Sequence, residues 1–194
     1  MPIEPVGDLL ALDPGLRHPA AALFRGGVLI AAERVKLDPS WKDLDPADRW
    51  VRIAGAIVRW GIGRNMEPRW LVYERPQIYT AAKSKGDPND LVGLAGVASA
   101  LAGMLSYAVA SRDIALGVAS ATPATWIGQV PKSETGNPWA SARGVRIGSR
   151  LTEDERQAVV PSHDAVDATG IGLYFLGRLA PTVVYGGVDD PAVS

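Results

Sequence analysis

The chain contains no cysteine and only two histidines among its 194 residues. The absence of cysteine excludes disulfides, thiolate metal sites and a thiol nucleophile. Two histidines are too few for the zinc sites that rely on several imidazoles. Any bound metal is therefore expected on carboxylates, and hard oxygen ligands favour magnesium or manganese.

The chain also lacks an excess of charge of either sign. It has 20 basic and 21 acidic residues, a formal net charge of −1. A nucleic-acid-binding protein of this composition needs a local basic patch rather than bulk charge. With 47% apolar and 21% charged residues the sequence is typical of a soluble globular protein. We expect one domain over residues 1–180, followed by a C-terminal tail, 181–194, that is partly disordered.

One stretch, residues 91–110 (LVGLAGVASALAGMLSYAVA), lacks charged residues altogether. Its length suffices to cross a bilayer, which takes about 20 residues. However, Ala, Gly and Ser contribute little to insertion, and the stretch has no aromatic belt. We interpret it as a helix of a soluble protein, buried on most sides, in which Gly96, Ala100 and Gly103 let another helix approach closely. The N-terminal MPIEPVGD has no signal-peptide character, so no membrane is expected.

Apolar periodicity and turn residues predict an α/β fold. Three antiparallel strands come first, and strands then alternate with helices. The result is a mixed five-stranded sheet flanked by helices. Residues 129–142, rich in Gly and Pro, are expected to form a loop. The strands are expected at 8–12, 20–24, 28–32, 70–73 and 114–119, and the helices at 46–61, 91–110, 151–157 and 162–177.

Four carboxylates fall where strands end or helices begin. Asp13 ends the first predicted strand, and Glu74 follows the apolar run Leu71-Val72-Tyr73. Asp164 and Asp167 lie one turn apart near a helix N-terminus, where the helix dipole favours negative charge. If the first and fourth strands are neighbours, the four acids could converge at one rim of the sheet. Two divalent cations would offset their repulsion and could hydrolyse a phosphodiester.

Each acid also has an ordinary explanation. An Asp-Pro-Gly turn occurs in many folds, and an acid near a helix start is more often a cap than a metal ligand. The four positions together are more telling than any one of them, although spacing alone is a weak signal.

The motifs around these acids resemble the RuvC-type Holliday-junction resolvases of the ribonuclease H-like superfamily, in particular divergent phage-encoded members. The resemblance covers most of residues 8–178 in the right order. It implies a nuclease domain whose acids Asp13, Glu74, Asp164 and Asp167 hold two Mg²⁺ ions, with Mn²⁺ able to substitute. It also implies a homodimer through the helix at 91–110. The stretches that carry it are LLALDPGLR, LVYERPQIY, DLVGLAGVASALAGML, TPATWIGQVPKSETGN and PSHDAVDATGIGLYFLG.

The resemblance also assigns secondary roles and shows departures. Lys132 falls where the family keeps a lysine close to the scissile phosphate. Some members replace the first acid of the final pair by histidine, but Asp164 holds that place here, so His163 is a second-choice ligand. Members typically carry a junction-wedging aromatic after the glutamate. Gln77 stands at about that position, with Tyr79 two residues on, and Tyr79 could stack on a base or belong to the core.

Basic and aromatic residues supply the candidate DNA contacts. Lys83 and Lys85, in the loop after Tyr79, are the first choice. Arg143 and Arg146, with Arg150, have helical spacing and could follow a DNA backbone. Most Lys and Arg residues are simply solvated. Trp126 and Trp139 could stack on bases, but tryptophans in such segments more often anchor loops to the core.

The sequence thus predicts a homodimeric, metal-dependent endonuclease that nicks branched DNA, most readily four-way junctions. Its expected location is the cytoplasm, that of a bacterial host if the chain is phage-encoded. One alternative is a nuclease of the same fold acting on flaps, RNA–DNA hybrids or single strands. Another is an inactive DNA-binding or structural relative. An actin-like nucleotide-binding protein is disfavoured because there is no second lobe.

Overall fold

A five-stranded mixed sheet forms the centre of the protein. The computed structural model describes residues 7–76, 88–128, 130 and 136–180. The strand order is β3-β2-β1-β4-β5; β1 pairs antiparallel with β2 and parallel with β4. The predicted sheet, with three antiparallel N-terminal strands, is confirmed. The strands are β1 (Asp8–Asp13), β2 (Ala20–Arg25), β3 (Val28–Arg34), β4 (Pro68–Glu74) and β5 (Gly117–Ala121).

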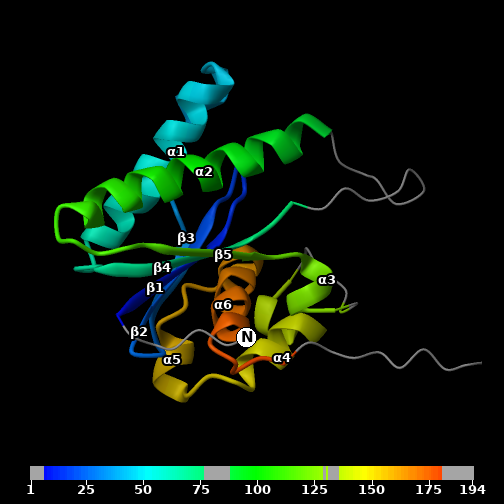
Figure 1. Ribbon diagram of the computed structural model, residues 1–194. Coiled ribbons are helices and arrows are strands. Elements are labelled where there is room, and N and C mark those ends of the chain that lie inside the picture. Colours follow the sequence, from blue (N-terminus) through cyan, green and yellow to red (C-terminus); the bar gives the residue numbers. More distant parts are fainter. Residues whose placement is uncertain (1–6, 77–87, 129, 131–135, 181–194) are drawn as a thin grey trace, which may run out of the picture.

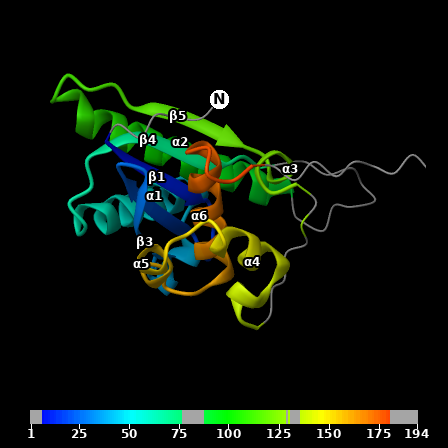
Figure 2. The ribbon, with the colours of Figure 1, turned by 90° about the horizontal axis from the view of Figure 1, so that it is seen from below.

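Helices cover both faces of this sheet (Figure 1). α1 (Pro46–Ile62) and α2 (Pro88–Ala110) lie together on one face. α6 (His163–Phe175) crosses the other face, with the shorter helices beside it, as the view from below also shows (Figure 2). These shorter helices are α3 (Pro123–Trp126), α4 (Ala142–Gly148), α5 (Glu153–Gln157) and the 3₁₀ helix η2 (Pro138–Ala140); the 3₁₀ helix η1 (Pro39–Asp43) instead packs against α1.

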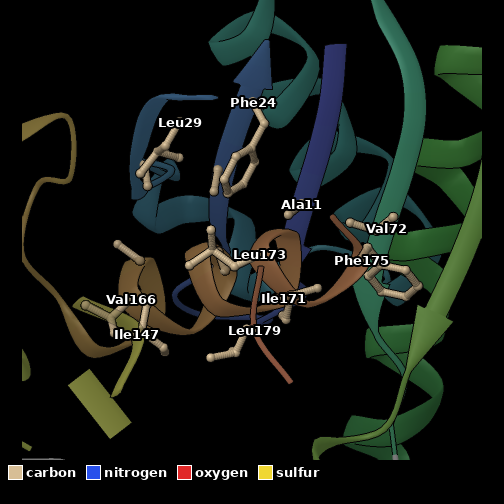
Figure 3. Packing of buried hydrophobic residues seen from close by; sticks show 14 of the residues in the cluster. Ala11, Phe24, Leu29, Val72, Ile147, Val166, Ile171, Leu173, Phe175 and Leu179 are labelled. Atoms are coloured by element: carbon tan, nitrogen blue, oxygen red, sulfur yellow. The ribbon is translucent and has the colours of Figure 1, made fainter. Parts of the chain in front are cut away.

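The alternation of side chains along the strands divides the core into two layers. In β1, Leu10 and Leu12 point to the α1–α2 side, whereas Leu9 and Ala11 point to the α6 side. Phe24, Val72 and Ile171 pack together in the α6 layer (Figure 3). The central strands are therefore buried on both faces, whereas Ile30 on β3 and Val118 on β5 are exposed. Polar side chains can gather at the carboxyl end of β1.

α2 has one buried face and one exposed face. Gly93 and Gly96 lie against Leu16 and Trp50, where any Cβ would overlap those side chains. Gly103 faces open space. The expectation that this helix is buried on most sides is therefore wrong for the single chain. By length and composition Asp90–Ala110 could cross a membrane, but its inner face packs on α1 and β4 as part of the core.

The start of β5 and the segment predicted as a loop differ from the predicted elements, and the short helices α3 and α4 were not predicted. β5 begins at Gly117 rather than residue 114, because its ladder with β4 starts at Gly117 opposite Trp70. Ile114 instead donates its backbone N–H to Val109 and closes the end of α2. Within the predicted loop at 129–142, residues 138–140 form η2, whose N-cap Asn137 accepts from Trp139 N–H.

Candidate active site

Asp13 and Glu74 lie side by side at one edge of the sheet. β1 and β4 are parallel neighbours with Leu12 opposite Tyr73, and each carboxylate is the next residue of its strand. Adjacent strands are about 4.8 Å apart. Alternation also puts both side chains on the α6 face, since Ala11 and Val72 point into that layer. The predicted proximity of the strand ends is therefore confirmed.

The N-terminal turn of α6 brings the second pair of acids to the same face. Ser162 caps this helix, and its Oγ accepts a hydrogen bond from Ala165 N–H at 3.1 Å. Asp164 and Asp167 lie in the first turns, and the helix packs on β1 and β2. Asp13 and Asp164 line one cleft of about 480 Å³. Its other lining residues are Gly15, Leu16, Arg17, His18, Arg34, Asp90, Leu94 and His163.

Arginines from the protein itself engage both acids of α6. Arg34 Nε donates to Asp164 Oδ2 at 2.6 Å, and the two side chains are 46% and 16% exposed. Arg143 Nη1 donates to Asp167 Oδ2 at 2.9 Å, with side chains only 12% and 4% exposed. The second pair is thus far less screened by water than the first.

Trp126 holds Glu74, the candidate acid at the end of β4. This tryptophan is fully buried at the end of α3, and its Nε1–H donates to Glu74 Oε2 at 2.9 Å. The guanidinium carbon of Arg143 lies 5.7 Å from the centre of the Trp126 ring. Trp126 and Arg143 therefore link Glu74 on β4 to Asp167 on α6.

The donor chemistry of this edge suits a hard divalent cation, because its acids offer carboxylate oxygens. In the described part of the chain, however, no three His, Asp or Glu side chains lie close enough together to hold one metal ion. Two of the four acids are instead engaged by arginine. A metal ion held by Asp164 and Asp167 would require these ion pairs to open or shift.

Several predicted residues lie outside the described part of the chain: Lys132, Gln77, Tyr79, Lys83 and Lys85. Their roles stay predictions. Trp126 is an anchor in the core, as the ordinary interpretation had it, and Trp139 is partly buried against the same layer. His163 lies in the cleft, and its buried Nε2 has no hydrogen-bond partner among the described residues.

Two of the three arginines predicted to follow a DNA backbone turn toward the protein instead, whereas Arg150 is exposed. Arg143 is directed inward, to Asp167. Arg146 donates to Ile127 O at 3.1 Å and also to Ala180 O. A DNA contact by either residue would require these hydrogen bonds to break, and such a contact remains a prediction.

Three partners of the acids were missed from the sequence: Arg34, Arg143 and Trp126. Strand register places Arg34 in line with Asp13, because Asp13 pairs with Ala20 and Ala20 pairs with Arg34, but it does not place Asp164 beside Arg34. Nothing in the sequence marks Trp126 as a partner of Glu74, since that contact depends on how the segment after β5 folds back.

Comparison with known proteins gives likeness in structure only. A scan against protein families and a search of curated proteins both find no match. Among solved structures, Thermus thermophilus RuvC in complex with a Holliday-junction substrate matches with a TM-score of 0.55 and 18% identity, covering 89% of this chain and 96% of that one. T. thermophilus RuvC also matches in a second structure, at 0.52 and 20%, over 88% and 95%.

The yeast mitochondrial Holliday-junction resolvase Ydc2 matches as well, with a TM-score of 0.51 and 13% identity over 91% of this chain and 80% of that chain. The fold is therefore ribonuclease H-like, of the kind found in Holliday-junction resolvases. The resemblance inferred from the motifs is confirmed at the level of the fold.

Proposed function

We propose that the protein is a magnesium-dependent endodeoxyribonuclease that nicks branched DNA, with four-way junctions as its preferred substrate. The observation that carries this proposal is the placement of Asp13 and Glu74 at the ends of neighbouring parallel strands, on the same face of the sheet that α6, with Asp164 and Asp167 in its first turns, covers. Similarity in fold to a resolvase solved with its junction adds support for the substrate class.

In this proposal Asp13, Glu74, Asp164 and Asp167 hold two Mg²⁺ ions, and Mn²⁺ can replace them. The bound ions supply Lewis acidity and an activated water for phosphodiester hydrolysis. The carboxylates orient that site, and the Trp126 indole N–H fixes the position of Glu74. Lys132 stabilises charge that develops on the scissile phosphate.

DNA binding and assembly complete the proposal. Lys83 and Lys85 contact phosphates and Tyr79 stacks on a base at the junction, since these residues directly follow the strand that carries Glu74. Two chains associate through α2, which presents two sites for paired nicks. The enzyme works in the cytoplasm, that of the bacterial host if a phage encodes it.

Substitution of the strand-end acids tests the catalytic part. Asp13→Asn and Glu74→Gln preserve shape but remove the charge that a cation needs, so each is expected to lower junction cleavage by at least about 10³-fold, a few kcal/mol of barrier. Junction binding, measured by gel shift in Ca²⁺, should stay within about threefold of wild type, because phosphate contacts supply most of it. Asp48→Asn, at an exposed acid of α1, is the control and should cleave normally. Full cleavage by either site variant would refute the assignment.

A second candidate is an inactive relative that binds DNA without cutting it. The ion pairs of Asp164 with Arg34 and of Asp167 with Arg143 favour it, because they neutralise two of the four acids without any metal. It predicts junction binding without cleavage in Mg²⁺ or Mn²⁺, for the wild type as well as for the variants.

A further inference from the structure

Arg143 is held in a buried position by contacts that a DNA-binding surface residue would not have. Besides Asp167, its Nη2 donates to the backbone oxygen of Val130 at 3.2 Å, and its guanidinium lies over Trp126. Its side chain is only 12% exposed. The arginine therefore belongs to the interior of the candidate active site.

This burial makes Asp167 depend on compensating charge. A carboxylate that is 4% exposed is costly to keep ionised without a partner. Arg143 supplies positive charge and a directed N–H at the place where Asp167 is expected to meet a cation. A guanidinium and a divalent cation on the same carboxylate oppose one another, since like charges repel strongly where water is excluded.

We propose that Arg143 is a built-in counter-ion of Asp167 that competes with the divalent cation and so lowers the affinity of the site for metal. The inference rests on the proposed function, because it takes Asp167 as a metal ligand. Arg143 is then a positioning residue. It orients Asp167 before a metal ion binds, and its hydrogen bond to Asp167 must break when the ion binds. The buried Nε of Arg143 has no hydrogen-bond partner among the described residues, so fewer bonds oppose that exchange.

The other ion pair provides an internal comparison. Arg34 and Asp164 are 46% and 16% exposed, so solvent screens their charges more fully. Removal of the Arg34 charge is therefore expected to change metal affinity less than removal of the Arg143 charge.

The test is the affinity for Mn²⁺ without DNA, measured by electron paramagnetic resonance on the full chain. Arg143→Gln is expected to bind Mn²⁺ at least about tenfold more tightly than wild type, because one buried like charge is gone. Arg143→Lys, which keeps the charge, should stay within about threefold of wild type. Arg150→Gln removes an equal charge from an exposed position after α4 and serves as the matched control. Equal or weaker binding by Arg143→Gln than by Arg150→Gln would overturn the inference.

A second measurement covers the case in which Arg143→Gln does not fold. Arginine Nε–H signals are recorded by ¹H–¹⁵N NMR on wild type, and Arg143→Lys identifies the Arg143 signal by its loss. Titration with Mg²⁺ should move or broaden this signal. A signal that stays unchanged while Mg²⁺ binds would overturn the inference about Arg143 but not the proposed function. A wild type that binds neither Mg²⁺ nor Mn²⁺ would overturn the proposed function with it.

Discussion

At the scale of single residues, Glu155 shows how this protein stabilises a buried charge. Its side chain is 2% exposed, yet it accepts from Arg178 Nη1 at 2.6 Å, Arg178 Nη2 at 2.8 Å and Leu29 N–H at 3.0 Å. It also completes a capping box with Thr152. The Arg178 hydrogen bonds, above all, lower the pKa of Glu155 to about 2.

A pH dependence of stability follows from this shift. The pKa of Glu155 is lower in the folded state, about 2 against 4.5, so its ionised form stabilises the fold above pH 4.5 and the gain disappears as the pH falls toward 2. The gain at pH 7 is about 3 kcal/mol at 1.36 kcal/mol for each pKa unit. Urea unfolding of wild type and Glu155→Gln from pH 7 to pH 3 measures it: the variant should be less stable at pH 7, and the difference should shrink as the pH falls.

Asp154→Asn is the control for this experiment, because Asp154 is exposed on the same short helix. Its stability should follow wild type to within about 0.5 kcal/mol, as is usual for surface substitutions. A Glu155→Gln deficit that stays constant across the whole pH range would contradict the account.

Asp8 repeats the pattern at the far end of β1. Burial alone would raise the pKa of Asp8, but hydrogen bonds from Arg25 and from Glu67 N–H outweigh it and leave the pKa below its usual value.

The edge positions of Asp13 and Glu74 could be predicted because strands end visibly in the sequence. The arginine partners of Asp164 and Asp167 could not, since these ion pairs join residues 130 and 24 positions apart and depend on the finished packing.

At the scale of elements, close contact between α1 and α2 depends on glycine. A Cβ at Gly96 would overlap the ring of Trp50. Gly96→Ala is therefore expected to destabilise the fold by about 1–3 kcal/mol, the usual cost of overpacking, as measured by urea unfolding.

Gly55→Ala in α1 is the matched control, because its Cβ would meet only the flexible end of Arg59 at 3.4 Å. It should stabilise the helix by about 0.5–1 kcal/mol, since glycine costs more backbone entropy than alanine. If Gly96→Ala were stabilising to the same extent, the described packing of α1 on α2 would be wrong.

The success of prediction varied between elements for physical reasons. α1 has a clear apolar periodicity after its cap Asp45, α6 is marked by its cap Ser162, and both helices were found. The start of β5 was not, because Ile114-Ala115-Leu116 is as apolar as a strand and only pairing with β4 decides where the ladder begins. α3 and α4 were not predicted either, because they are short and tertiary packing rather than propensity stabilises such helices.

At the scale of the whole molecule, α2 presents an uncharged outer stripe. Val92, Ala95, Ser99, Gly103 and Tyr107 follow one another at helical spacing and are all exposed, Tyr107 to 86%. An apolar stripe of this length fits a second copy of the same helix, in line with the proposed dimer.

Ser99→Arg places a charge in the middle of this stripe. Wild type is expected to sediment as a dimer and Ser99→Arg as a monomer in analytical ultracentrifugation, because two buried like charges would face each other across a two-fold axis. Val160→Arg, at an exposed apolar residue before α6, should remain dimeric. A monomeric wild type would remove α2 as a dimer interface.

The fold of the molecule could be predicted further than its chemistry. The mixed sheet with three antiparallel N-terminal strands and the resolvase-like resemblance could be predicted, and structural similarity over 89% of the chain confirms both at the level of the fold. The state of the site could not be predicted, because the engagement of Asp164 and Asp167 by arginine appears only when β3, α4 and α6 are placed together.

Cleavage of a labelled four-way junction, with Mg²⁺ and with EDTA, is the most direct test of the central claim. The account predicts paired nicks in Mg²⁺, none in EDTA and none for Asp13→Asn, with slower cleavage of a flap, a single strand and an RNA–DNA hybrid in the same assay. Faster cleavage of one of those substrates would support the nuclease assignment and change the assigned substrate. A wild type that binds the junction but leaves it intact in both Mg²⁺ and Mn²⁺ would contradict the claim.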